Sequence, residues 1–353
     1  MPPADAHIVF ERRAAAGVVR LNRPQALNAV THDMVRRLRA QLDRWAGDPD
    51  VTRVIITASP GRAFSSGGDI RHLYELGRAG RFEDALAFWR DEYPLNAAIK
   101  HYHKPYIALI DGIVMGGGVG VSVHGAYRVA GDRFAFAMPE VGIGFFPDVG
   151  ATWFLPRMPG EIGTYCALTG ARLERADALA AGIATHCVPS ARLPALLDAL
   201  AQGAPVDATL AAHAEPAPPQ GPVTARRAAI DRLFAGETVE SILAALDREA
   251  TSDSPDANWA AETAATIRTK SPLSLKIALA QVRRGARWDF ASCMRAEFRI
   301  VSRIIEGHDF YEGVRAVIVD KDYAPRWRPA TLAQVSAADV ERHFAPLARE
   351  LVL

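Results

Sequence analysis

The sequence predicts an α/β fold followed by a helical C-terminal region. In the first half of its 353 residues, short β-like runs alternate with segments of helical periodicity. From Gly150 on, the pattern is mainly helical. The composition, 49% hydrophobic and 23% charged, is that of a globular chain, and the length is sufficient for a large core. We therefore expect one α/β core with helices attached behind it.

Three segments are expected along the chain. Residues 1–200 form the core that carries the functional site, 201–223 are an exposed loop rich in Ala and Pro, and 224–353 are a helical region. Strands are expected at His7–Phe10, Gly17–Leu21, Val51–Thr57, Tyr106–Ile110, Tyr127–Ala130 and Phe134–Ala137. One helix is expected to begin after the N-cap Thr31. Further helices are expected at Arg81–Tyr102, Thr224–Phe234, Val239–Arg248, Trp259–Thr269, Leu273–Arg284 and Asp289–Ile305.

Charge and cysteine content exclude several classes of protein. The formal net charge is +1, which gives no electrostatic case for a nucleic-acid partner. The three cysteines, Cys166, Cys187 and Cys293, are far apart, which argues against a disulfide framework and a zinc site and favours a reducing compartment. The start, MPPADAH, lacks the features of a secretory or transit peptide, and no apolar run is long enough to span a membrane. A cytoplasmic location is expected.

The usual catalytic and nucleotide-binding motifs are absent from the sequence. It has no Gly-Lys pair for a phosphate-binding loop, and the run from Gly116 to Gly120 does not fit G-x-G-x-x-G. The segment Gly120–His124 (GVSVH) misses the final Gly of the G-x-S-x-G motif. No H-E-x-x-H is present. We expect no metal and no cofactor.

Two glycine-rich turns remain as candidates for ligand binding. Gly67-Gly68-Asp69 and Gly116-Gly117-Gly118 each follow a strand and precede a helix. Backbone N–H groups at such a turn can approach a ligand closely and point outward. Two turns side by side would form a two-donor oxyanion hole. The alternative is tight packing of strand on helix with no ligand.

Two acidic residues stand out in a long apolar stretch. Glu140 and Asp148 are the acids of the segment Met138–Asp148, which is otherwise apolar and interrupted by Gly and Pro. An acid in such surroundings is costly to bury unless it is paired or functional. Near an oxyanion hole, a carboxylate can act as a base or as a nucleophile toward an acyl carbon. The alternative is that Asp148 caps a helix at Val149–Leu155 and Glu140 pairs with an arginine.

These residues together resemble the crotonase (enoyl-CoA hydratase/isomerase) superfamily, and within it the 3-hydroxyisobutyryl-CoA hydrolase branch. The resemblance covers nearly the whole chain and is weakest at about 195–260. Its superfamily motifs are Gly67-Gly68-Asp69 and Gly116-Gly117-Gly118, and the motifs more specific to the branch are Phe146-Pro147-Asp148 and Gly307-His308-Asp309-Phe310. Further matches are Asn22-Arg23-Pro24, Met138-Pro139-Glu140, Ser271-Pro272, Glu312-Gly313-Val314-Arg315 and Asp320-Lys321-Asp322.

The resemblance implies a fold, a function and site residues. The fold would be a spiral of β-β-α units, with C-terminal helices that form a homo-oligomer in most relatives; apolar stripes on these helices fit an intrachain core equally well. The substrate would be an acyl-CoA, with CoA as part of the substrate. Gly68 and Gly117 would form the oxyanion hole, Glu140 and Asp148 would be catalytic, and Glu92 would contact the substrate, unless Glu92 is an ordinary acid on the surface of a helix.

One position separates hydrolases from hydratases within the resemblance. Hydratases carry a second catalytic Glu three residues after the oxyanion Gly, and this sequence has Gly120 there. We therefore expect hydrolysis of a short β-hydroxyacyl-CoA such as 3-hydroxyisobutyryl-CoA, a step the resemblance places in valine catabolism. An enoyl-CoA hydratase or isomerase is the alternative. A relative that only binds CoA or RNA would be expected to lose Glu140 or the glycines, which are intact.

Overall fold

The computed structural model describes residues 6–216 and 218–353. Residues 1–5, on which the expected absence of a leader peptide partly depends, lie outside this range. The chain divides into two compact units. The first contains the chain up to Asp69, then Asp91–Phe136 and Leu173–Thr224. The second contains Ile70–Arg90, Ala137–Arg172 and Ala225–Leu353.

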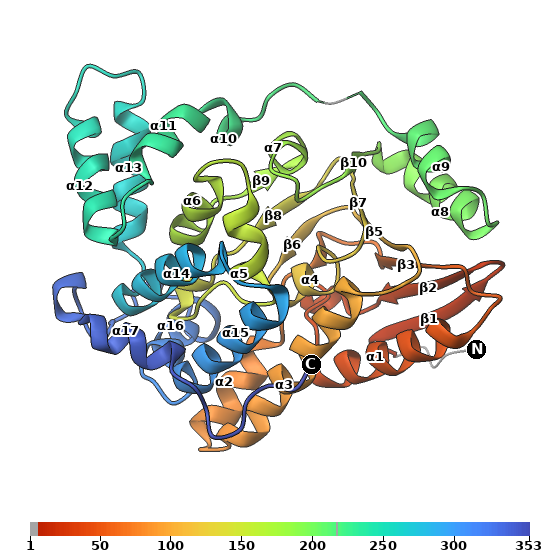
Figure 1. The fold of residues 1–353 in the computed structure, drawn as a ribbon, viewed down its shortest axis with the longest axis horizontal. Helices are drawn as coiled ribbons and strands as arrows, with labels where there is room; N and C mark the ends of the chain where they lie inside the picture. Colours follow the sequence, from red (N-terminus) through yellow and green to blue (C-terminus); the bar gives the residue numbers. More distant parts are fainter. Residues whose placement is uncertain (1–5, 217) are drawn as a thin grey trace. The chain divides into compact units, whose positions relative to one another are not determined.

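Two β-sheets lie mainly in the first unit, and from β3 to β8 successive strands alternate between them (Figure 1). Within the described residues, one sheet has the order β1-β2-β3-β5-β7-β10 and the other β4-β6-β8-β9. The strands are β1 (Ile8–Arg13), β2 (Ala16–Leu21), β3 (Arg53–Ala58), β4 (Ala63–Ser65), β5 (Tyr106–Ile110), β6 (Ile113–Met115), β7 (Tyr127–Ala130), β8 (Ala135–Ala137), β9 (Leu173–Glu174) and β10 (His186–Cys187). This alternation confirms the predicted α/β class and is the pattern expected of β-β-α units.

The first unit begins with the predicted hairpin and helix. β1 pairs with β2 in antiparallel register, and β2, β3, β5, β7 and β10 then run parallel. The hydroxyl oxygen of Thr31 accepts a hydrogen bond from the Met34 N–H and caps α1 (His32–Gly47). A Cβ on Gly17 would lie 2.5 Å from the Trp45 ring, so this glycine lets α1 pack directly on the hairpin.

The predicted loop at 201–223 contains a helix, α9 (Val206–His213). Pro205 occupies its N-cap, a position at which the missing N–H has no cost, and the side chain of Leu210 is fully buried. Leu210 belongs to the apolar cluster formed by β2, β3, β5, β7 and α8 (Leu193–Ala201). The helix was not predicted because the segment is rich in Ala and Pro and too short to show a clear helical period. Burial of its apolar side chains against the sheet stabilises it.

Helices make up most of the second unit, as the periodicity predicted. They are α2 (Ile70–Arg78), the first part of α3 (Phe82–Lys100), α5 (Ala151–Phe154), α6 (Ile162–Thr169), α11 (Arg227–Leu233), α12 (Val239–Ala250), α13 (Ala257–Arg268), α14 (Pro272–Gly285), α15 (Phe290–Ile304), α16 (Asp309–Val314) and α17 (Ala337–Phe344). The first unit also holds α4 (Gly117–Gly120), α7 (Arg175–Ala180) and most of α10 (Pro222–Ala225). Short 3-10 helices are η1 (Pro24–Ala26), η2 (Glu140–Ile143), η3 (Leu155–Arg157), η4 (Ser190–Arg192) and η6 (Leu332–Gln334), and η5 (Arg315–Val319) is a π-helix that continues α16.

Among the described residues, none of the helices combines the length and the apolar character needed to cross a bilayer. Cys166, Cys187 and Cys293 are buried free thiols.

Candidate active site

In the first glycine turn, the Gly68 N–H does not take part in the hydrogen bonds that join the turn to Val30. Gly68 and Val30 form an isolated parallel bridge. Its two hydrogen bonds run from the Val30 N–H to the Gly67 oxygen and from the Asp69 N–H to the Val30 oxygen, so the Gly68 N–H is not used in the bridge. Arg23 fixes the turn by an ion pair with Asp69 at 2.8 Å. Gly67 has φ +118°, which explains why a glycine stands there.

The second glycine turn lies against the first. Gly117 is the first residue of α4, so its N–H has no partner within the helix. A Cβ placed on Gly117 would lie 3.2 Å from the Gly68 nitrogen and 2.7 Å from Oε1 of Glu92. The structure thus brings Gly68, Gly117 and Glu92 together within the first unit, and a side chain at position 117 would press on Oε1 of Glu92 and on the Gly68 nitrogen.

Glu92 is buried on α3, with 1% of its surface exposed. This excludes the alternative that it is an ordinary acid on a helix surface. One helical turn further on, the side chain of Asn96 is also fully buried. Among the described residues, neither polar atom of the Asn96 amide has a hydrogen-bond partner. Since buried polar atoms are nearly always satisfied, this face of α3 has hydrogen-bonding capacity for water or a ligand.

Glu140 begins the turn η2 in the second unit and is 7% exposed. Its Oε2 has no hydrogen-bond partner, and no ion pair with an arginine is found for it, among the described residues. Burial raises the pKa of Glu140 well above its ordinary value, and the negative charge of Asp148 raises it further. A carboxylate held in this way is strongly basic and poorly solvated, which suits a base or a nucleophile.

The backbone that carries Glu140 is held by the C-terminal helices. A Cβ on Gly144, which has φ +66°, would lie 2.1 Å from the Asp309 oxygen, and a Cβ on Gly313 would lie 2.3 Å from the Ile143 carbonyl carbon. α16 therefore packs directly on this turn. The Ser271 N–H also donates to the Val141 oxygen at 3.2 Å.

Asp148 lies in a turn before α5 and is 4% exposed. The helix begins at Ala151 with Gly150 as its N-cap, so Asp148 does not occupy the N-cap position. A third buried acid, Glu297 on α15, accepts hydrogen bonds from the N–H groups of Gly150 and Thr152. Glu297 is not among the site residues predicted from the sequence. Its one signal is an acid within the apolar stripe of the helix at 290–304.

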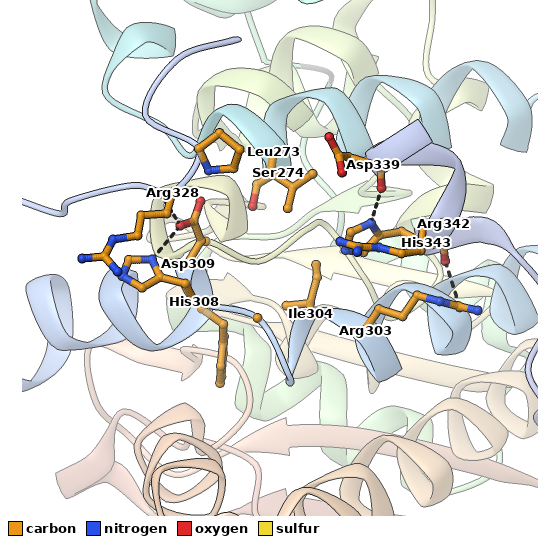
Figure 2. Close-up of a pocket in the computed structure, with 14 residues that line it drawn as sticks. Leu273, Ser274, Arg303, Ile304, His308, Asp309, Arg328, Asp339, Arg342 and His343 are labelled. Carbon is orange, nitrogen blue, oxygen red and sulfur yellow. Dashed lines mark hydrogen bonds and ion pairs between the residues drawn. The ribbon is translucent and has the colours of Figure 1, made fainter. Parts of the chain in front are cut away.

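The Gly-His-Asp-Phe motif has a structural role in the second unit. Asp309 accepts a hydrogen bond from the Ser271 hydroxyl at 2.7 Å. It also accepts one from the Arg328 N–H at 2.7 Å and pairs with His308 at 3.0 Å (Figure 2). It therefore joins the start of α14, the start of α16 and the segment around Arg328. The adjacent cavity, of about 200 Å³, is lined on its other side by Arg303, Asp339, Arg342 and His343.

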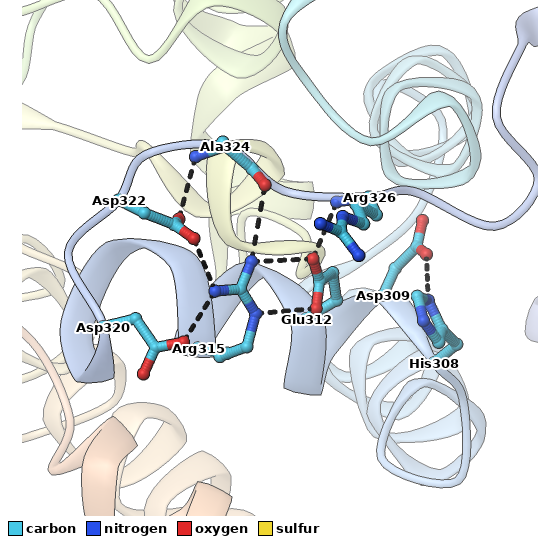
Figure 3. A network of polar contacts seen from close by, with 8 residues as sticks. All are labelled: His308, Asp309, Glu312, Arg315, Asp320, Asp322, Ala324 and Arg326. Atoms are coloured by element: carbon cyan, nitrogen blue, oxygen red, sulfur yellow. Dashed lines mark hydrogen bonds and ion pairs between the residues drawn. The ribbon is translucent and has the colours of Figure 1, made fainter.

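The remaining C-terminal motifs form one polar network. Arg315 contacts Glu312 at 2.9 Å and both Asp320 and Asp322 at 2.7 Å (Figure 3). Glu312 in turn accepts a hydrogen bond from the Arg326 N–H. The network fixes the chain after α16, and through α16 it supports the turn that carries Glu140.

The five predicted site residues are therefore found in two groups. Gly68, Gly117 and Glu92 lie in the first unit, and Glu140 and Asp148 lie in the second, where Glu297 joins them. Of the two arginines near the first glycine turn, Arg71 donates to the Ile318 oxygen at 3.0 Å, which gives it a structural contact. Arg62 is exposed.

Comparisons with known proteins agree with this description. Residues 16–344 match the family model described as enoyl-CoA hydratase/isomerase. The chain is 43% identical to "3-hydroxyisobutyryl-CoA hydrolase, mitochondrial" of Danio rerio, over 98% of this chain and 91% of the relative. It is 44% identical to the protein of the same name from Rattus norvegicus, over 97% of this chain and 89% of the relative.

Among solved structures, the chain is similar to a carnitinyl-CoA dehydratase from Mycobacterium thermoresistibile. The identity is 43%, the TM-score is 0.92, and 99% of each chain is covered. This agreement confirms the expected fold. The names of the relatives differ in the reaction that they state, hydrolysis in one case and dehydration in the other. The geometry of the site must therefore decide between them.

Proposed function

The chain belongs to the enoyl-CoA hydratase/isomerase family, and on this premise we propose that it hydrolyses the thioester of a short β-hydroxyacyl-CoA, with 3-hydroxyisobutyryl-CoA as the preferred substrate. One observation carries the choice of hydrolysis. The second unit holds two buried acids whose charges interact, Glu140 and Asp148, whereas position 120, where a hydratase would carry its second acid, is a glycine. The relatives named as hydrolases support the choice of substrate.

The mechanism begins with the carbonyl oxygen of the thioester. The N–H groups of Gly68 and Gly117 would donate to this oxygen and stabilise the negative charge that develops on it. Each such donor contributes about 3–4 kcal/mol of transition-state stabilisation. No proton has to move at this stage, because the donors are fixed backbone groups.

Glu140 would then break the thioester by one of two routes. In the first, its carboxylate attacks the carbonyl carbon, the C–S bond breaks, CoA leaves as the thiolate and is protonated, and water hydrolyses the resulting anhydride. In the second, Glu140 takes a proton from a water molecule that attacks the carbon directly; the C–S bond then breaks, and the CoA thiolate leaves with the proton that Glu140 returns. Asp148 would position the water or the substrate hydroxyl. Single-turnover reaction in ¹⁸O-labelled water separates the routes, because only the anhydride route can place label in Glu140.

Thiol release from 3-hydroxyisobutyryl-CoA, measured beside crotonyl-CoA hydration, tests the proposed function. We expect thiol release at a rate at least about 100-fold above any hydration, because Gly120 supplies no second acid for addition across a C=C bond. Carnitinyl-CoA dehydration is assayed in parallel because a solved relative carries that name. Hydration or dehydration without thiol release would refute the hydrolase assignment and support the lyase alternative.

Glu92 is proposed to select the β-hydroxyl group of the substrate. Replacing it by Leu should lower the kcat/KM ratio of 3-hydroxyisobutyryl-CoA to isobutyryl-CoA by about 10- to 100-fold, because a buried hydrogen bond to a charged group contributes about 1.5–3 kcal/mol. Glu92→Gln retains one acceptor oxygen and should show a smaller decrease. Glu83→Gln, at an exposed position of the same helix, is the control. An unchanged ratio in Glu92→Leu would remove Glu92 from substrate recognition.

The location and the oligomeric state of the protein are separate predictions that accompany the proposed function. The two relatives compared above are named mitochondrial, so the predicted cytoplasmic location is not supported by their names. We retain a compartment with reduced thiols as the prediction, in line with the three free cysteines. A homo-oligomer formed through the C-terminal helices stays a prediction, testable by the mass of the purified protein in solution.

A further inference from the structure

Glu297 is a buried acid that has no role in the proposed mechanism. It lies on α15 with none of its surface exposed. Its Oε2 accepts a hydrogen bond from the Gly150 N–H at 2.8 Å, and its Oε1 accepts one from the Thr152 N–H at 2.9 Å. No Lys or Arg pairs with it among the described residues. A buried carboxylate without a cation is costly, so its contacts with the backbone call for an explanation.

Both contacts of Glu297 are to the turn that carries Asp148. The turn contains two consecutive residues with left-handed backbone angles, Val149 with φ +53° and Gly150 with φ +90°. For a β-branched residue such as valine this conformation is an outlier, and it persists only where the surroundings enforce it. Strain of this kind, directly after a proposed catalytic acid, requires a restraint from outside the turn.

Side chains of two helices, α14 and α15, provide this restraint (Figure 1). Gln281 on α14 donates to the Pro147 oxygen at 2.5 Å and to the Thr152 hydroxyl at 3.2 Å. Glu297 on α15 holds the two N–H groups on the other side of Val149. The backbone is thus fixed at Pro147, directly before Asp148, and at Gly150, two residues after it. Each oxygen of Glu297 accepts from a different N–H group, so one side chain restrains two peptide units of the turn.

We propose that Glu297 is a positioning residue for Asp148: it holds the strained turn 147–152 so that the Asp148 carboxylate is fixed where the reaction needs it. This inference rests on the proposed function, in which Asp148 acts on the substrate or on water. It adds a residue, distant in sequence from every motif of the site, on which the rate depends although it does not contact the substrate.

Electrostatics link the same two acids. Burial, and next the charge of Asp148, raise the pKa of Glu297 to about 8, while the hydrogen bonds from Gly150 and Thr152 oppose the rise. Among the described residues, Cys293 on the same helix also interacts electrostatically with Glu297; burial raises the pKa of this thiol to about 12, so it stays neutral. The proton affinity of Glu297 therefore responds to Asp148, which agrees with their contact through the turn.

The test is a double-mutant cycle with Glu297→Gln and Asp148→Asn. Gln has nearly the same size as Glu, but its NH₂ group must face one of the two backbone N–H groups, so one hydrogen bond is lost. We expect Glu297→Gln to lower kcat for thiol release about 10- to 100-fold and to change KM less than 3-fold. In the Asp148→Asn background it should lower kcat less than 3-fold further, because the residue that it positions is already disabled. Glu262→Gln, at an exposed position of α13, is the control.

Two outcomes would overturn the proposal. One is a wild-type kcat in folded Glu297→Gln. The other is an equal loss of kcat in the wild-type and Asp148→Asn backgrounds, which would mean that Glu297 acts on the fold as a whole. If Asp148→Asn alone leaves thiol release unchanged, the proposed function of Asp148 fails instead, and the kinetic cycle separates this result from the other two.

A second measurement does not depend on activity. Glu297 binds its proton more tightly in the folded protein, with a pKa of about 8, than in the unfolded chain, where the ordinary value is 4.5. The unfolding free energy should therefore fall as the pH rises from about 4.5 to 8. Glu297→Gln should remove part of this decrease, measured by urea unfolding at pH 5 and pH 8. The same pH dependence in both proteins would show that folding does not raise the proton affinity of Glu297, and would remove the electrostatic link between Glu297 and Asp148.

Discussion

Glu140→Gln is expected to lower kcat for thiol release by about 10³-fold and to leave KM within a few-fold of the wild-type value. The amide keeps the size of the side chain but can neither attack the thioester nor accept a proton from water, and a group of this kind contributes about 10²–10⁴-fold to the rate. Substrate binding should persist, because the proposed contacts of Gly68, Gly117 and Glu92 are unchanged. Steady-state kinetics with 3-hydroxyisobutyryl-CoA provide the measurement.

Thermal unfolding provides the check on this variant. Burial penalises the charged form of Glu140, so its amide should be at least as stable as the wild type at pH 8. Glu262→Gln, which makes the same chemical change on an exposed surface, should match the wild type in both assays. A Glu140→Gln protein that is folded and retains more than about one tenth of the wild-type kcat would exclude Glu140 as nucleophile or base.

The pH dependence of the wild type follows from the same acid. Glu140 must be ionised in order to act, and burial together with Asp148 raises its pKa. We therefore expect kcat/KM to fall as the pH decreases through an apparent pKa well above 4.5. In Asp148→Asn the residual activity should show this decline at lower pH, because the second cause of the shift has been removed. A decline in the wild type that begins only near pH 4.5 would contradict the electrostatic description of the site.

Gly117→Ala is expected to lower kcat/KM by about 10²–10³-fold. The added methyl group would lie 3.2 Å from the Gly68 nitrogen and 2.7 Å from Oε1 of Glu92, in the space between the proposed oxyanion donors and the substrate-binding acid. The carbonyl oxygen would then be displaced from at least one donor, and one such donor is worth about this factor in rate.

Gly47→Ala is the matched control for this substitution. A Cβ at Gly47 meets no atom within 4 Å, so activity should be unchanged and stability equal or slightly increased. Circular dichroism spectra and unfolding midpoints of both variants show whether the fold is intact. A folded Gly117→Ala protein with wild-type kcat/KM would mean that the two turns are a packing feature and do not bind the carbonyl.

Most of the secondary structure was predictable from the sequence. The helix after Thr31, the strand at Tyr106–Ile110 and the helices between Leu273 and Ile305 agree with the structure to within two residues. Each depends on local signals, namely an N-cap, a continuous apolar run or a 3.6-residue repeat, which neighbouring residues supply by themselves. The helix at Val206–His213 was not predicted, because it is stabilised by the burial of Leu210 against strands that are distant in the sequence.

The Gly-His-Asp-Phe motif shows the limit of a motif as a guide to function. From the sequence it marked the hydrolase branch, and no role could be assigned to it. In the structure Asp309 joins three segments, and its backbone packs on Gly144, beside the turn of Glu140. Such a role is invisible along the chain, because it depends on which backbone atoms meet after folding.

The sequence by itself determined the α/β class, the two glycine turns and the pair of acids, because glycine-rich turns and acids in an apolar run are unusual enough to be recognised where they stand. Only the tertiary structure decided that Glu92 is buried beside Gly117, that Asp148 does not occupy the N-cap of α5, and that Glu297 holds the turn of Asp148. The physical reason is that burial, proton affinity and backbone strain arise from contacts between residues that are distant in the sequence. In the case of Gly150 and Glu297, 147 positions separate the two groups joined by one hydrogen bond.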